Sequence, residues 1–257
     1  LTELDGSDIQ HLVRDLIGDA PNLANIVADV AQQSDGNPFF AEELVHALAQ
    51  SGTLLGERGE YRIVSSDWLT PTLPATIEAV IGARIDLLPA LEKAALQIGA
   101  VIGKEFPLAI AMEVSGIPEQ EIRKLFSRLC DLDLIVADNN ADKPGYAFRH
   151  PLIQEVAYAM QLRSRRAQLH SSVASAIETA PWGTTEESAG LLAYHCEAAG
   201  RVVEAAMHLR RAALWVGRTN SSQAMAEWKK VRWLLRDQGS DAGVDQLRAL
   251  ASGRVLG

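Results

Sequence analysis

Hydrophobic residues recur along most of the chain with the three-to-four-residue spacing of amphipathic helices, which predicts a mainly α protein. In the first sixty residues, three such stretches each end at a glycine: Gly18, Gly36 and Gly52. We expect Ser7 to cap the first helix, and Asn37 to cap the third with Pro38 at its first helical position. Segments 53–55 and 61–64 flank two glycines and predict a small β-hairpin.

Helical spacing resumes after Pro71 and Pro74 and predicts four helices between residues 77 and 131. The apolar segments that follow are Leu134–Val136 and Tyr146–Phe148. A polar turn at 139–145 separates them, so they are expected to pair as two strands. Three helices followed by a two-stranded wing is the element order of a winged-helix domain. We therefore assign residues 71–150 to a winged-helix domain with a small β-wing.

The pattern from Pro151 onward is helical to the end of the chain. It predicts one long helix over 152–177, followed by helices near 186–199, 202–217 and 221–237. The alternation of small and large residues fits helical hairpins with the tetratricopeptide period of about 34 residues. We assign residues 151–257 to a helical arm and tetratricopeptide-like repeats. Such repeats need several units for stability, so we expect the chain to continue past Gly257.

The overall composition is typical of a folded globular protein, because the 257 residues are 47% hydrophobic and 22% charged. The net charge of −9 arises in the first sixty residues, which hold eleven acidic and two basic side chains. This break in composition leads us to treat residues 1–70 as a separate helical subdomain. An acidic total argues against a nucleic-acid coat protein, so no nucleic-acid partner is expected.

Three further features lead us to expect a cytoplasmic fragment of a larger protein. The two cysteines, Cys130 and Cys196, imply no disulfide framework and fit a reducing compartment. No apolar run approaches the roughly 20 residues of a membrane span, and no signal peptide is visible, so no membrane partner is expected. The chain begins at Leu1 rather than at a methionine.

The sequence contains no motif that would make this chain an enzyme by itself. A phosphate-binding P-loop requires Gly-Lys followed by Ser or Thr, and the single Gly103–Lys104 pair is followed by Glu105. No histidine has a zinc-binding spacing with either cysteine, and no Gly-x-Ser-x-Gly motif occurs. We therefore predict no catalytic residue and no metal site.

Two local sequences stand out from this background. Residues 36–44 read Gly-Asn-Pro-Phe-Phe-Ala-Glu-Glu-Leu, and by themselves they fit a helix stop, a cap and a helix start with favourable acidic charges at Glu42 and Glu43. Residues 146–152 place His150 where a wing strand meets a helix N-terminus, whose N–H groups favour anions and an uncharged imidazole. Taken alone, this second sequence is better explained by a capping or surface histidine.

Together the two sequences resemble the lid and winged-helix domains of STAND-type signalling ATPases. The resemblance is strongest to bacterial regulators in which a class III nucleotidyl cyclase domain precedes an ATPase and tetratricopeptide repeats. Further similar segments lie at 73–81, 100–106 and 148–158, in the same order and spacing. Related modules also occur in LuxR-type transcription regulators, so the output domain of the parent protein stays open.

The resemblance implies specific roles for four residues. Pro38 would contact the adenine ring, Gly36 and Asn37 would shape the turn, and His150 would sense the ADP phosphate. The P-loop would lie upstream of Leu1, so this chain alone would not hydrolyse ATP and would hold ATP or ADP only together with that core. The parent protein would be an ATPase switch, possibly with a cyclase domain, whose repeats bind a protein or small-molecule effector.

The sequence is also compatible with two other functions. A winged helix can bind DNA, but the recognition-type helix at 118–131 carries three basic and three acidic side chains, whereas a groove-reading helix is normally basic. The helical C-terminal part could instead be a peptide-binding scaffold without nucleotide dependence. Its arginines at 163–166 and 210–211 could meet an acidic partner, although such runs are usually solvated surface.

Overall fold

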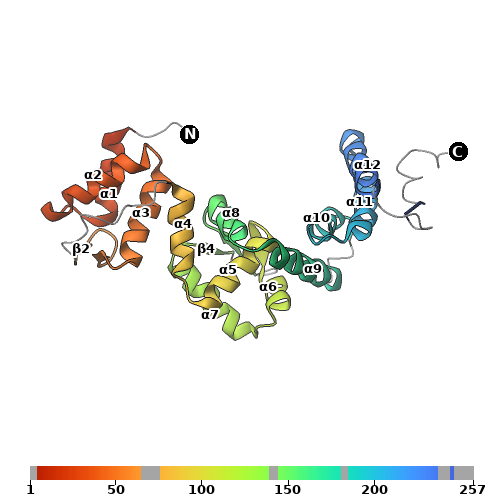
Figure 1. Ribbon diagram of the computed structural model, residues 1–257, viewed down its shortest axis with the longest axis horizontal. Helices are drawn as coiled ribbons and strands as arrows, with labels where there is room; N and C mark the ends of the chain where they lie inside the picture. The colour runs from red at the N-terminus through yellow and green to blue at the C-terminus, as the bar shows by residue number, and fades with distance from the viewer. Residues whose placement is uncertain (1–4, 65–75, 139–143, 181–184, 237–243, 246–257) are drawn as a thin grey trace. The chain divides into compact units, whose positions relative to one another are not determined.

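The computed structural model confirms a mainly α protein with two small antiparallel sheets (Figure 1). It describes residues 5–64, 76–138, 144–180, 185–236 and 244–245. The chain divides into two compact units, Leu1–Lys93 and Ala94–Gly257, and each is described by itself. Within the described ranges, no helix combines the length and the apolar character needed to cross a bilayer.

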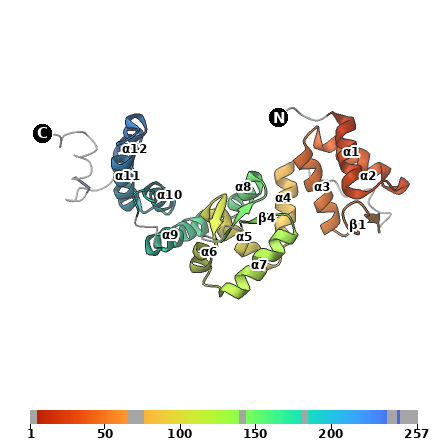
Figure 2. The ribbon, with the colours of Figure 1, turned by 180° about the vertical axis from the view of Figure 1, so that it is seen from behind.

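Unit 1 is built from short helices around one hydrophobic core. Its elements are α1 (Gly6–Ile17), η1 (Pro21–Leu23), α2 (Ala24–Ser34), α3 (Pro38–Gln50), β1 (Leu54–Leu55), β2 (Arg62–Ile63) and α4 (Ile77–Asp86). The core takes buried side chains from α1, α2, α3, β1 and α4. Strands β1 and β2 pair antiparallel, as the predicted hairpin requires, and β1 is labelled in Figure 2. The predicted linker prolines, Pro71 and Pro74, lie outside the described residues.

The cap of α1 differs from the prediction. Asp5, not Ser7, is the N-cap, and its carboxylate accepts hydrogen bonds from the backbone N–H of Ser7 at 2.9 Å and of Asp8 at 2.8 Å. The Ser7 hydroxyl also donates to Asp5, at 2.8 Å. A carboxylate two residues earlier therefore satisfies the first free N–H groups of the helix, and the prediction for Ser7 was wrong. The predicted end of the helix at Gly18 is confirmed, because the N–H of Gly18 donates a hydrogen bond to the Arg14 carbonyl and closes the last turn.

Unit 2 begins with the element order of a winged helix. Its first elements are α5 (Ala90–Ile102), β3 (Glu105–Pro107), α6 (Leu108–Ser115), α7 (Glu119–Asp131), β4 (Ile135–Asp138) and β5 (Gly145–Phe148). The division between the two units falls in the first turn of α5. The strands form one antiparallel sheet in the order β3-β5-β4. Only two wing strands were predicted, and residues 139–143 of the predicted turn lie outside the described residues.

The missed strand β3 is three residues long and is defined by its partner. Glu105 pairs with Ala147 and Phe106 with Tyr146 of β5, so a tertiary pairing creates the strand. Phe106 is buried, and its ring centroid lies 5.4 Å from Phe126 and 5.7 Å from Phe148. This aromatic group fills the space between the sheet and α7.

The rest of unit 2 is helical. Its helices are α8 (Pro151–Ala159), α9 (Arg163–Thr179), α10 (Ala189–Ala198), α11 (Val202–Val216) and α12 (Ser221–Leu235). The single helix predicted over 152–177 was wrong, because the chain breaks between α8 and α9, where Leu162 is extended. The side-chain amide of Gln161 donates to the carbonyls of Gln97 at 3.1 Å and Ala157 at 3.3 Å, which anchors this break against α5.

Successive helices at the end of unit 2 pack against one another as hairpins (Figures 1 and 2). A second hydrophobic core joins α9, α10, α11 and α12, with Ala174, Cys196 and Leu209 among its buried members. The predicted turn residues at 181–183 lie outside the described residues. The domain boundaries assigned from the sequence, at residues 70 and 150, remain predictions.

Candidate functional site

The turn between α2 and α3 holds three of the four predicted site residues. Asp35 adopts a left-handed conformation with φ 45°, and Gly36 follows with φ 77°. Two consecutive left-handed residues reverse the chain sharply, and glycine adopts such a φ without steric cost. The N–H of Asn37 then bonds the carbonyl of Ser34 at 2.9 Å and closes the turn.

Asn37 and Pro38 start α3 as predicted. The Asn37 side chain accepts a hydrogen bond from the N–H of Phe40 at 3.2 Å, and Pro38 occupies the first helical position. Both residues are exposed, whereas Phe40 and the following Ala41 are buried in the core of unit 1. The turn therefore presents the Pro38 ring to solvent while its other side is anchored by packing.

A buried ion pair fixes α3 against α4. The carboxylate of Glu43 accepts a hydrogen bond from the guanidinium of Arg84, and the two side chains are 3% and 0% exposed. The sequence-based interpretation of Glu43 as a helix-start charge was wrong, because Glu43 is buried and lies beyond the first turn of α3. The signal that could have revealed the pair is Arg84 itself, which completes the buried stripe formed by Val80, Ile81 and Ile85.

His150, the fourth predicted residue, is the N-cap of α8. Its Nδ1 accepts a hydrogen bond from the N–H of Leu152 at 3.2 Å, and its carbonyl accepts one from Ile153 at 3.0 Å. Pro151 has no N–H to offer. The expectation of open N–H groups for an anion was therefore wrong, because the first donors of α8 already bond His150 itself.

The protonation of His150 agrees with the predicted uncharged imidazole. Burial lowers the pKa of His150, and the nearby Glu155 carboxylate opposes this effect more weakly. Because Nδ1 accepts a hydrogen bond, the proton of the neutral ring resides on Nε2. His150 can thus act as a neutral donor through Nε2.

The structure brings Gly36, Asn37 and Pro38 together in one turn of unit 1, whereas His150 belongs to unit 2. The resemblance to STAND-type ATPases assigns nucleotide contacts both to the turn in unit 1 and to His150 in unit 2. Each part is ordered locally: Asn37 caps α3 above the core of unit 1, and His150 caps α8.

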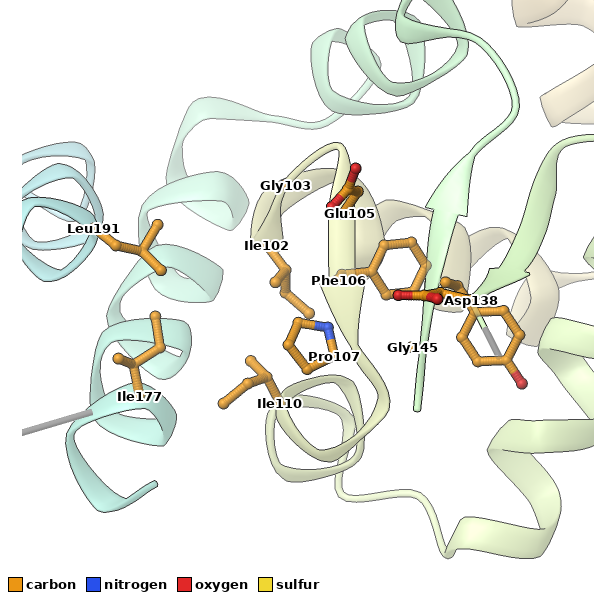
Figure 3. A pocket seen from close by; sticks show the side chains of 11 residues that line it. Ile102, Gly103, Glu105, Phe106, Pro107, Ile110, Asp138, Gly145, Ile177 and Leu191 are labelled. Carbon is orange, nitrogen blue, oxygen red and sulfur yellow. The ribbon is translucent and has the colours of Figure 1, made fainter. Parts of the chain in front are cut away.

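Unit 2 also contains a pocket of about 440 Å³ that the sequence analysis did not predict. Ile177 of α9 and Leu191 of α10 face Pro107 and Ile110 across it (Figure 3). Its lining is mainly apolar, with the carboxylates of Glu105 and Asp138 as charged members. The lining residues span about half of unit 2 in sequence, so only the packed fold assembles them.

A second feature that the sequence analysis missed is a buried histidine pair. Nδ1 of His170 lies 2.9 Å from Nδ1 of His195, and Nε2 of His170 lies 2.9 Å from the hydroxyl of Tyr158. Both imidazoles are fully buried. Burial lowers the pKa of His170 to about 4 and that of His195 to about 3, so both rings are neutral at neutral pH.

Comparison with known proteins defines no family for this chain. No protein-family model matches it. One curated protein, the "Uncharacterized protein R02095" of Rhizobium meliloti (strain 1021), is 28% identical over 177 residues. The match covers 67% of this chain but only 16% of that protein. The chain therefore spans less than a fifth of this relative, whose name states no activity.

Proposed function

We propose that this chain is the regulatory part of a STAND-type ATP-binding signalling protein. In this proposal, the lid, residues 1–70, and the winged helix close on an adenine nucleotide held by a P-loop domain upstream. The observation that carries the proposal is the Gly36–Asn37–Pro38 turn, which is anchored by a buried core and presents its proline to solvent. The resemblance of residues 36–44 to the STAND lid motif assigns this turn to adenine.

The chemistry of Pro38 suits contact with a purine. The pyrrolidine ring is apolar and rigid, so it can pack on the face of an adenine ring without losing side-chain entropy on binding. The core beneath Phe40 and Ala41 holds the turn in place before any ligand arrives. A preorganised apolar contact of this kind stabilises the bound state at low cost.

His150 would recognise the phosphate through its side chain. Since the first N–H donors of α8 are engaged in capping, an incoming phosphate would meet the Nε2–H of the imidazole rather than the backbone. An anion at this position also favours the protonated ring and would raise the pKa of His150 from its lowered value. Loss of ADP would return the imidazole to its neutral form.

The two parts would work as a switch. A nucleotide bound between the upstream core, the lid and the winged helix favours one packing of the parent protein, and nucleotide exchange favours another. The match covers only 16% of the relative from Rhizobium meliloti, so in that protein the similar segment is part of a much longer chain. This supports the proposal that the present segment also belongs to a longer chain. Such a parent protein would be a cytoplasmic ATPase, with or without a cyclase domain.

The helical repeats would bind the effector that biases this switch. Helices α10, α11 and α12 expose seven large hydrophobic side chains: Leu191, Tyr194, Met207, Leu214, Trp215, Met225 and Trp233. Exposed apolar side chains on these helices would suit an interaction site or contact with a neighbouring repeat. The same observation favours the second candidate function, a peptide-binding scaffold without nucleotide dependence.

The proposal is tested with the longer natural chain that includes the upstream P-loop region. We expect Pro38→Ala and His150→Asn to weaken ADP binding, measured by calorimetry, by about 5- to 150-fold, as for the loss of a buried contact of about 1–3 kcal/mol. Asparagine at position 150 retains an N-cap and isolates the loss of the imidazole. The matched controls are Pro21→Ala, at an exposed proline that also opens a helical turn, and His11→Ala, at an exposed histidine of α1.

Unchanged ADP affinity in both site variants would refute the nucleotide roles. If effector binding by the repeats is then independent of adenine nucleotides, the scaffold function is correct. A salt-dependent shift of duplex DNA would instead support the winged helix as a DNA reader. The structure gives that outcome little support, because Arg123 on the exposed face of α7 is paired with Glu119 at 2.7 Å.

A further inference from the structure

Three side chains with metal-ligating atoms converge at one edge of the second hydrophobic core. Glu178 lies at the end of α9, Cys196 in α10 and His208 in α11. One ligand atom from each residue lies within 4.8 Å of the other two, and no other group of this kind occurs among the described residues. Glu178 Oε1 and His208 Nε2 are only 3.4 Å apart.

The geometry is close to that of a bound cation. Ligand atoms around a tetrahedral zinc ion, with bonds of about 2.0–2.3 Å, lie roughly 3.3–3.8 Å from one another. The Glu178–His208 distance already falls in this range. The Cys196 sulfur lies within 4.8 Å of both partner atoms, so binding would require it to approach them by at most about 1–1.5 Å, through rotation of the side chains.

The donor set identifies the class of cation. A thiolate, an imidazole and a carboxylate together suit zinc and similar transition metals, whereas calcium and magnesium require oxygen ligands. Cys196 is fully buried, while the side chains of Glu178 and His208 are 37% and 14% exposed. An ion would therefore enter from the Glu178 side, and water could occupy a fourth position.

Charges of both signs surround the three ligands, and Arg211 Nη1 lies 3.5 Å from His208 Nδ1. Glu178 lies in the last turn of α9, where the negative end of the helix dipole disfavours a carboxylate unless a positive charge neutralises it. Arg201 lies 3.9 Å from Glu178, but it directs its guanidinium to Glu204, with Nε at 2.9 Å from that carboxylate. The alternative explanation is an ion-pair network of these residues that needs no metal.

We propose that Glu178, Cys196 and His208 bind a divalent cation of the zinc class, which joins α9 to the α10–α11 hairpin. Binding replaces the thiol proton of Cys196 with a sulfur–metal bond, and the proton is released to solvent. Because the unfolded chain does not hold the three ligands together, the bound cation stabilises the folded helices.

The test uses the complete 257-residue chain, without a purification tag and stripped of metal by a chelator. Cobalt(II) is titrated as the probe, since a tetrahedral cobalt–thiolate site gives visible bands and a near-ultraviolet charge-transfer band. We expect both in the unmodified chain, their loss on addition of zinc, and a higher unfolding midpoint with zinc. Cys196→Ser abolishes the charge-transfer band, and His208→Gln and Glu178→Gln weaken cobalt binding by at least about 10-fold.

Cys130→Ser is the matched control, because Cys130 is half-buried in α7 and lies outside the site. This variant should retain the full cobalt spectrum. The proposal is overturned if the unmodified chain gives no cobalt–thiolate band, or if the band depends on Cys130 instead of Cys196. If Cys196→Ser does not fold by circular dichroism, the loss or retention of cobalt affinity in His208→Gln decides the question.

Discussion

The buried pair of Glu43 and Arg84 makes a quantitative prediction about the packing of unit 1. Glu43→Leu removes the carboxylate but leaves the Arg84 guanidinium in a site where its side chain is 0% exposed. Removing one partner of a buried ion pair typically destabilises a protein by about 3–5 kcal/mol, since the remaining charge stays desolvated. Arg84→Met should have a similar cost for the same reason.

The double variant, Glu43→Leu with Arg84→Met, replaces both charges with apolar side chains of comparable size. We expect its stability to lie near that of the unmodified chain, because neither desolvated charge remains. The control is Asp86→Asn, which breaks the Asp86–Lys93 pair at 2.6 Å, where both side chains are partly exposed. An exposed pair of this kind should contribute less than about 1 kcal/mol.

Hydrogen exchange of peptides from α3 and α4, read by mass spectrometry, measures this effect in unit 1 alone. The single variants should exchange roughly 10²- to 10⁴-fold faster than the unmodified chain, and the double variant and Asp86→Asn should change little. The reasoning is refuted if each single variant costs less than about 1 kcal/mol, or if the double variant shows the sum of the two single effects.

Two further predictions concern unit 2. Because burial lowers the pKa of His170 to about 4, from 6.5, the unfolded chain binds a proton between these pH values that the folded chain does not. His170 alone should therefore lower the unfolding free energy of the metal-free chain by about 3 kcal/mol as the pH drops from 6.5 to 4, and His195, whose pKa is lowered to about 3, should add to this fall. The fall should be less steep in His170→Phe, and a flat profile in chemical denaturation would contradict this. A Cβ at Gly99 would lie 2.8 Å from the Phe106 ring, so Gly99→Ala should cost about 1–3 kcal/mol in the same assay. Gly190→Ala, with no atom within 4 Å of the new Cβ, should be neutral or stabilising, and equal effects of the two would count against the packing argument.

The sequence predicts the fold well where the determinants are local. Hydrophobic spacing predicted most helices, and the Asn37 cap, Pro38 and Gly18 were predicted from neighbouring residues alone. The errors arose where distant contacts decide the outcome. Strand β3 exists because it pairs with β5, and the chain breaks after α8 where Gln161 bonds a carbonyl of α5.

The candidate site shows the same division. The Gly36–Pro38 turn could be predicted because all its hydrogen bonds join residues within a few positions of one another. The Glu43–Arg84 pair and the Glu178–Cys196–His208 group could not, since their members lie on separate helices that meet only after packing. The cysteine and histidine of that group are on different helices, so they lack the short spacing of a zinc motif.

The most direct test of the proposed nucleotide switch is hydrogen exchange in the longer natural chain, with and without ADP. If the lid turn and the winged helix both close on the nucleotide, ADP should slow exchange together at the backbone N–H groups that the non-proline residues of 36–40 and 150–154 carry. ADP that binds the upstream domain and leaves both segments unchanged would contradict the account.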